Sequence, residues 1–167
     1  MNDPKHLALW RQIESAFAEV IYPGDDRIAY SNVDRDGASL AAAFRGKHWK
    51  ELTPHELHHH EMTFLSREGL QFYLPAYLLA SMEGYDGTLY EDIRPFTVYG
   101  LTLPDEDTPR NRQLRESRLR DFEIFTPAQK RVIRSFLEHA RDEWTNDFPG
   151  GESPSKALER YWDQDWQ

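Results

Sequence analysis

The placement of the prolines constrains the fold of this chain more than any other feature. Five of the ten prolines directly follow a residue that favours the N-cap position of a helix. The side-chain oxygen of such a residue accepts a backbone N–H of the first turn, and proline supplies a helical φ where its missing N–H costs nothing. The five pairs are Asp3-Pro4, Thr53-Pro54, Thr108-Pro109, Thr126-Pro127 and Ser153-Pro154. The sequence therefore predicts five helix starts.

The spacing of the apolar residues supports further helices. Helices predicted from this spacing and from stop signals span residues 4–21, 39–45 and 127–144. Ser66 is a candidate N-cap for a helix whose body, residues 70–82, is apolar on most sides, which is typical of a central buried helix. Pro75 lies within that body, so we expect a kink or a break near Leu74.

The predicted fold is mostly α, with about six to seven helices in one compact domain over residues 1–167. Its core is expected over residues 4–145, followed by a C-terminal helical tail over residues 153–167. Residues 84–107 contain three glycines, two prolines and scattered charges. We interpret them as a long irregular connection with at most a minor β element, a short strand over residues 96–103.

Composition excludes several classes of function. The chain has no cysteine, which excludes disulfides, cysteine-ligated zinc, iron–sulfur clusters and thiol catalysis. Its 29 acidic and 20 basic residues give a net charge of −9, which argues against binding to nucleic acid or to an anionic membrane. The N-terminus lacks the pattern of a signal peptide, and no apolar run is long enough to span a bilayer. We therefore expect a cytoplasmic protein with no membrane contact.

Four phrases of the sequence resemble, in the same order, an uncharacterised bacterial family known only as a domain of unknown function. They are YPGD at 22–25, HWKEL at 48–52, FLSREGLQFYLPAYLLASM at 64–82 and FTPAQKRVIRSFLEH at 125–139. The resemblance covers roughly residues 13–145. It implies a bacterial origin and a single compact domain, and it brings no established activity or catalytic residues.

One motif has the pattern of a catalytic metal site. His55, Glu56 and His59 fit H-E-x-x-H, in which two histidines one helical turn apart chelate zinc and the glutamate acts as general base. Glu56 has an alternative role, however, because Thr53 and Glu56 also fit a capping box at the start of this helix. Catalytic zinc needs a third protein ligand, for which the candidates are Glu68, Glu83 and Glu91. We therefore expect no cofactor, with a zinc site as the alternative.

The charges are unevenly distributed. Five arginines lie between residues 110 and 120, and they separate two acidic stretches, residues 83–107 and 142–167. The arginines either pair with neighbouring carboxylates, which we favour, or form a binding surface. From the arginine-rich segment and the acidic residues just before it, we select five candidate partner contacts: Asp105, Glu106, Asp107, Arg112 and Arg115.

The C-terminal tail carries three aromatic residues, Tyr161, Trp162 and Trp166. We expect them to dock the tail on the body of the protein. Alternatively, they anchor a partner or a second copy of the chain, because tryptophan and tyrosine often dominate binding hot spots.

Three hypotheses for function remain open. The leading one is a non-enzymatic acidic protein of the bacterial cytoplasm that binds a basic partner protein, as an immunity or inhibitor protein does. The second is a zinc-dependent hydrolase that uses His55, Glu56 and His59. The third is a structural module that self-associates through its aromatic tail, with the oligomeric state left open.

Overall fold

The computed structural model describes residues 3–30, 34–83, 93–144 and 153–167. These residues form eight α-helices around one apolar core, and they contain no strand. The helices are α1 (Pro4–Phe17), α2 (Arg35–Phe44), α3 (Pro54–His59), α4 (Arg67–Met82), α5 (Ile93–Leu101), α6 (Pro109–Phe122), α7 (Pro127–Glu143) and α8 (Pro154–Ala157), which continues as a π-helical turn, Leu158–Trp162. The predicted mostly α fold is confirmed.

All five helix starts predicted from the proline pairs are confirmed. In α1, α3, α6, α7 and α8 the residue before the proline is the N-cap, and its side chain accepts a backbone N–H of the first turn. In α3 and α7 the reciprocal bond of the capping box is present as well, through Glu56 and Gln129. The local sequence alone therefore specifies where these helices begin.

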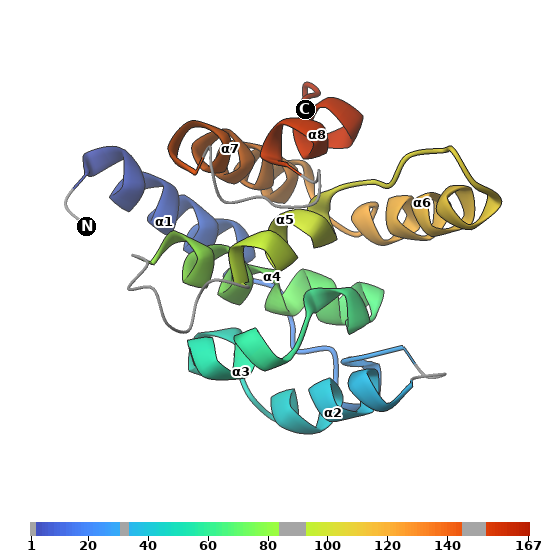
Figure 1. The fold of residues 1–167 in the computed structure, drawn as a ribbon. Helices are drawn as coiled ribbons and strands as arrows, with labels where there is room; N and C mark the ends of the chain where they lie inside the picture. The colour runs from blue at the N-terminus through green and yellow to red at the C-terminus, as the bar shows by residue number, and fades with distance from the viewer. Residues whose placement is uncertain (1–2, 31–33, 84–92, 145–152) are drawn as a thin grey trace.

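Helix α4 lies at the centre of the molecule, between α1 and α7 on one side and α2 and α3 on the other (Figure 1). From Gly69 to Met82 all but one of its residues are buried, as its apolar character predicts. Of the kink or break expected near Leu74, the break is wrong, because the helix continues through Pro75 to Met82. Packing on all sides offsets the hydrogen bond that proline removes from the helix.

The segment that we expected to be irregular contains a helix. Residues 93–101 form α5, so the predicted strand over residues 96–103 is wrong; residues 84–92 lie outside the described part of the chain. Val98 and Thr97 are β-branched and favour strands in isolation. Here both are buried, and the Thr97 hydroxyl donates to Ile93 O at 2.7 Å within the helix and lies 3.1 Å from the Ser81 hydroxyl on α4. Tertiary packing thus overrides the local preference.

Two helix boundaries also differ from those predicted. α1 ends at Phe17 instead of near residue 21, and Ile21 lies outside it with 86% of its surface exposed. α2 begins at Arg35, four residues earlier than predicted, because the Asp34 side chain caps it by accepting the N–H groups of Asp36 and Gly37.

Candidate functional site

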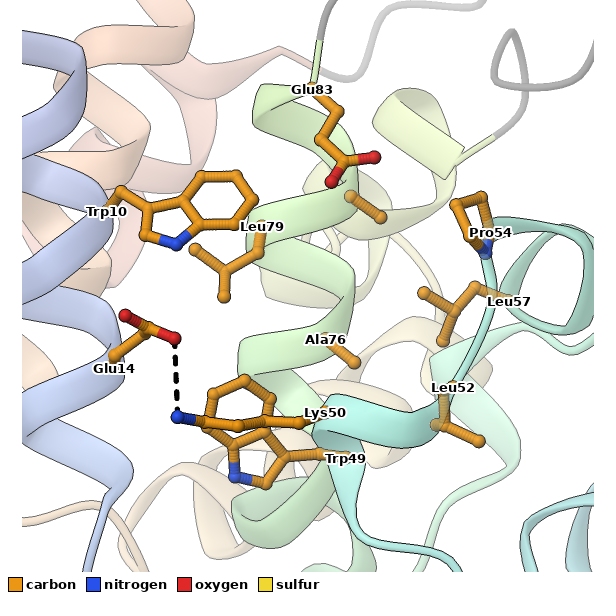
Figure 2. Close-up of a pocket in the computed structure, with 11 residues that line it drawn as sticks. Trp10, Glu14, Trp49, Lys50, Leu52, Pro54, Leu57, Ala76, Leu79 and Glu83 are labelled. Atoms are coloured by element: carbon orange, nitrogen blue, oxygen red, sulfur yellow. Dashed lines mark ion pairs between the residues drawn. The ribbon is translucent and has the colours of Figure 1, made fainter.

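A pocket of about 320 Å³ opens between α1, α4 and the segment that leads into α3. Its size is at the lower end of the range for ligand sites in proteins. The floor includes Ala76 and Leu79 of α4 (Figure 2), and Ala80 of the same helix also lines the pocket. Leu57 and Pro54 of α3 form an apolar wall. The pocket thus offers an apolar interior of a size that fits one long side chain or a small molecule.

Two tryptophans line the pocket from opposite sides (Figure 2). Trp10 lies on α1, whose buried face is formed by Leu9 and Ile13. Because Trp10 lies next to that face in the helix, its indole is only partly buried and reaches the pocket. Trp49 lies in the short 3₁₀-helix Trp49–Glu51 and is 3% exposed. The pocket is therefore walled by two aromatic surfaces held by separate elements.

The turn that carries Trp49 is fixed by side-chain hydrogen bonds. The His48 side chain accepts Lys50 N at 3.1 Å, and Glu51 accepts His48 N at 2.6 Å, which together form a capping box. The buried Tyr73 hydroxyl contacts Lys47 O at 2.9 Å from α4. These contacts hold Trp49 and the neighbouring Lys50 in place against the pocket.

Three charged residues line the pocket, namely Glu14, Lys50 and Glu83. The Lys50 ammonium lies 3.3 Å from the Glu14 carboxylate and 5.1 Å from the centre of the Trp49 ring. Within the described residues, the Glu83 carboxylate has no hydrogen-bond or ion-pair partner. The Trp49 Nε1–H is buried and likewise has no acceptor among these residues. The pocket mouth therefore has a net charge of −1 and one unpaired carboxylate.

This arrangement is suited to binding. Aromatic faces beside carboxylates attract cations, and the apolar floor accepts a hydrocarbon stem. Of the described residues that line the pocket, none is a serine, a threonine, a histidine or a tyrosine. The lining thus lacks the hydroxyl–histidine pair of a serine-type hydrolase.

Sequence reasoning missed this pocket. No sequence motif singles out Trp10, Trp49 or Lys50 as site residues. The contacts between them depend on how α1 packs on α4, which no local pattern reveals. The one available signal is Glu14 one turn after Trp10, which places a carboxylate beside an indole on the same helix face.

The H-E-x-x-H segment forms α3, and its residues separate onto two faces. Leu57 is buried and reaches the pocket, whereas His55 and His59 are exposed, with ring centres 4.5 Å apart. Glu56 accepts Thr53 N at 2.8 Å and forms an ion pair with Lys47. The two histidines therefore lie together, while Glu56 has the structural role that the capping box predicts.

Burial acts to raise the pKa of Glu56, but hydrogen bonds from Lys47 and Thr53 outweigh it, so this pKa lies below its ordinary value of 4.5. The ionised carboxylate therefore stabilises the fold above pH 4.5, and this contribution is lost as the pH falls through the lower folded-state pKa. We expect Glu56→Ala to lower the free energy of unfolding by about 1–2 kcal/mol at pH 7. Urea titrations at pH 7 and pH 3 measure this, and the cost must shrink at pH 3. An equal or larger cost at pH 3 would contradict the assignment.

The described residues contain no group of three or more histidine, aspartate and glutamate side chains placed to hold a metal ion. His55 and His59 thus have no third ligand within this part of the chain. Of the candidate third ligands, Glu83 lies at the pocket, and Glu91 lies outside the described residues. What remains on α3 is a pair of exposed imidazoles.

The arginine-rich segment forms α6, and its side chains bind the chain that precedes it. Arg115 forms an ion pair with Glu106 at 3.1 Å, and Arg112 donates to Glu106 O at 2.9 Å. Asp105 pairs instead with Arg160 at 2.6 Å, and Asp107 accepts Asn111 Nδ2 at 2.6 Å. These five candidate residues therefore take part in contacts within the chain, as the pairing interpretation predicts for Arg115.

Arg118 of α6 is the most deeply buried of these arginines, at 8% exposed. Its guanidinium donates to Tyr99 O at 3.0 Å and to Thr102 O, at the C-terminal end of α5. The last carbonyls of a helix lack partners within the helix and carry partial negative charge. Arg118 thus caps α5, which gives one of the five arginines a structural role.

The aromatic tail docks on the body of the protein. Trp162 is fully buried, and its Nε1 donates to Leu101 O at 2.7 Å. Trp166 is half-buried, and its Nε1 donates to Trp162 O at 3.1 Å. Tyr161 lies between Trp162 and Trp166, with ring centres 4.8 and 5.3 Å away. Of the three, only Tyr161 and Trp166 retain a surface that a partner can reach.

The described residues define a small all-helical fold with a tryptophan-lined pocket. The chain belongs to the family of unknown function DUF6714, whose model matches residues 6–166. This confirms the predicted membership of an uncharacterised family and extends it over almost the whole chain. Comparison with curated proteins and with solved structures gives no match.

Among the described residues, no helix has both the length and the apolar character that crossing a membrane requires.

Proposed function

We propose that this chain is a non-enzymatic acidic protein of the bacterial cytoplasm that binds a basic partner protein, in the manner of an immunity or inhibitor protein. The pocket between α1, α4 and α3 carries the proposal. It combines two tryptophan walls with carboxylates at its mouth, and one of these, Glu83, is unpaired among the described residues. Buried aromatic anchors and complementary charge are the features by which protein interfaces select partners.

The overall charge supports the same proposal. A net charge of −9 accelerates the approach of a basic protein and repels acidic ones. The arginines of α6 are already counted in this net charge, and Arg115 is paired with the Glu106 carboxylate. Long-range attraction thus brings the partner close, and the pocket supplies the specific contact.

The state of Glu56 favours binding over the zinc-dependent hydrolase. A general base must be free to accept a proton and needs a pKa near the working pH. Glu56 is engaged by Lys47 and Thr53, and its pKa lies below the ordinary value. The self-association hypothesis has less support, because Trp162 is used inside the core.

Co-purification with two charge-matched variants tests the proposal. Glu14→Gln/Glu83→Gln removes two carboxylates at the pocket, whereas Glu123→Gln/Glu159→Gln removes two exposed carboxylates on elements that do not line it. Both raise the net charge by the same amount. We expect the wild-type protein and the second variant to retain a basic protein from the native host. With that protein purified, we expect the pocket variant to bind at least about tenfold more weakly.

Three results would contradict this proposal. One is that wild type retains no protein beyond what the pocket variant retains. Another is that the retained protein is acidic. The third is that the two variants lose affinity equally, which would indicate general electrostatic attraction with no role for the pocket.

A further inference from the structure

We infer that the pocket between Trp10 and Trp49 binds the guanidinium of an arginine side chain from the partner, and that Lys50 occupies the same position until this arginine displaces it. The inference rests on the proposed function and specifies the chemistry of the contact. Its basis is the position of Lys50, which already makes within the chain the two contacts that a bound cation needs.

Lys50 combines a carboxylate and an aromatic face. Its ammonium lies 3.3 Å from Glu14 Oε1 and 5.1 Å from the centre of the Trp49 ring. More than half of its side chain is exposed, whereas its backbone is held by the turn that carries Trp49. Figure 2 shows its Nζ and the Trp49 Nε1 on the side of the pocket that faces α1. Lys50 thus marks a cation position and is free to leave it.

The geometry favours a guanidinium over an ammonium in that position. A guanidinium is planar and stacks on indole faces, is less strongly hydrated than an ammonium, and can bond two acceptors at once. The pocket offers two indoles and the two carboxylates Glu14 and Glu83, which come from different helices. Lys50 engages only Glu14 and Trp49. An arginine that enters along the apolar floor also passes Trp10 and Glu83, which line the pocket toward its other end (Figure 2).

The pocket also fits the stem of arginine. Ala76, Leu79 and Ala80 provide a floor of methyl and isobutyl groups, along which three methylenes can lie. The end of α4 lies beside Glu83, which is its C-cap residue. Helix C-termini carry partial negative charge, so they favour a cation at that end. The floor, the walls and the charge of the pocket thus all favour a long side chain that ends in a positive group.

Lys50 therefore sets a threshold for binding. A free cation at low concentration cannot displace the Lys50 ammonium. An arginine on a docked partner can, because docking raises the effective concentration of that arginine at the pocket. Removing the Lys50 charge while keeping its stem, as in Lys50→Met, leaves Glu14 without its ion-pair partner. We expect that variant to bind arginine peptides about five- to tenfold more tightly than wild type does.

The experiment uses the full chain and a capped peptide, acetyl-Ala-Arg-Ala-amide, with the same peptide carrying citrulline as a neutral control of equal shape. The readout is the NMR signals of the tryptophan indole N–H groups, assigned with single Trp→Phe variants. We expect the Trp10 and Trp49 signals to shift and saturate with the arginine peptide but not with the citrulline peptide. Glu14→Gln/Glu83→Gln is expected to weaken binding at least about tenfold, and Glu123→Gln/Glu159→Gln less than about twofold.

Several outcomes would overturn the inference. Equal shifts with citrulline remove the charge requirement, and tighter binding of a lysine peptide removes the preference for guanidinium. Unchanged or weaker binding by Lys50→Met removes the displacement of Lys50. Tighter binding of free arginine than of the peptide makes this a small-molecule site. If a basic partner binds wild type but not Glu14→Gln/Glu83→Gln while the arginine peptide gives no response, the proposed function stands and this inference alone fails.

Discussion

Trp162→Ala is expected to lower the free energy of unfolding by about 3–5 kcal/mol, the range for removing a large aromatic side chain from a packed core. Trp162 is the largest fully buried side chain of the described residues, and its ring centre lies 4.8 Å from that of Phe122. Its Nε1 also satisfies Leu101 O at 2.7 Å, at the end of α5. The substitution therefore leaves both a cavity and an unpaired carbonyl. Urea denaturation followed by circular dichroism measures the change as a shift in midpoint at constant slope.

Trp162→Phe separates the two contributions. Phenylalanine keeps a ring against Phe122 but cannot donate to Leu101 O, so we expect a smaller cost of about 1–3 kcal/mol. Trp166→Ala is a second control, because Trp166 is half-buried and near the chain end. A Trp162→Ala variant no less stable than Trp166→Ala would show that the tail does not hold the core together.

The helix starts could be predicted because their causes are local. Thr53 and Pro54, or Thr126 and Pro127, determine the cap within four residues, and nothing distant is needed. The same reasoning identified the capping role of Glu56 and so reduced the weight of the H-E-x-x-H pattern. Where a motif has both a local structural explanation and a distant functional one, the local explanation can be tested from the sequence itself.

The wrong predictions for α5 and for Pro75 share a different cause, because tertiary packing determines the structure of both segments. α5 contains Pro95, Thr97, Val98 and Gly100, and a local analysis does not assign a helix to such a segment. It forms because its carbonyl end is bound by Arg118 and Trp162, which lie 16 and 61 residues away from the carbonyls that they cap. Pro75 is tolerated in α4 for a related reason, since the helix is buried around it. Neither effect is visible in a window of neighbouring residues.

The pocket could not be predicted for the same reason. Trp10 and Trp49 are 39 positions apart in the sequence, and α4 brings Ala76 and Leu79 between them. The candidate partner contacts that the sequence suggested were chosen for charge or aromatic content, and most of them are now engaged within the chain. Charge and aromatic content indicate where strong interactions form, but whether these are internal or external depends on the fold.

Gly69→Ala is expected to destabilise the protein by at least about 2 kcal/mol, although glycine to alanine within a helix normally stabilises by about 1 kcal/mol. Gly69 lies in the first turn of α4, where a Cβ would come within 2.1 Å of Ile28 O. The obstacle is a backbone atom, fixed by its own bond from Ser66 N at 2.9 Å. Neither partner can rotate away, so α4 and the segment around Ile28 must separate. Urea titration of the alanine variant measures the cost.

Gly100→Ala provides the matched comparison, because Gly100 is also a helical glycine with a close neighbour. The three atoms nearest to its added Cβ all belong to the Met62 side chain, at 2.8–2.9 Å. Met62 is buried, but methionine is unbranched and has three rotatable side-chain bonds, so it can repack more readily than the backbone at Ile28. We expect Gly100→Ala to change the free energy of unfolding by less than about 1 kcal/mol, with the helix propensity of alanine offsetting the repacking. Equal losses of free energy of unfolding in the two variants would contradict this prediction. They would show that the backbone at Ile28 moves away from an added Cβ as easily as the Met62 side chain does.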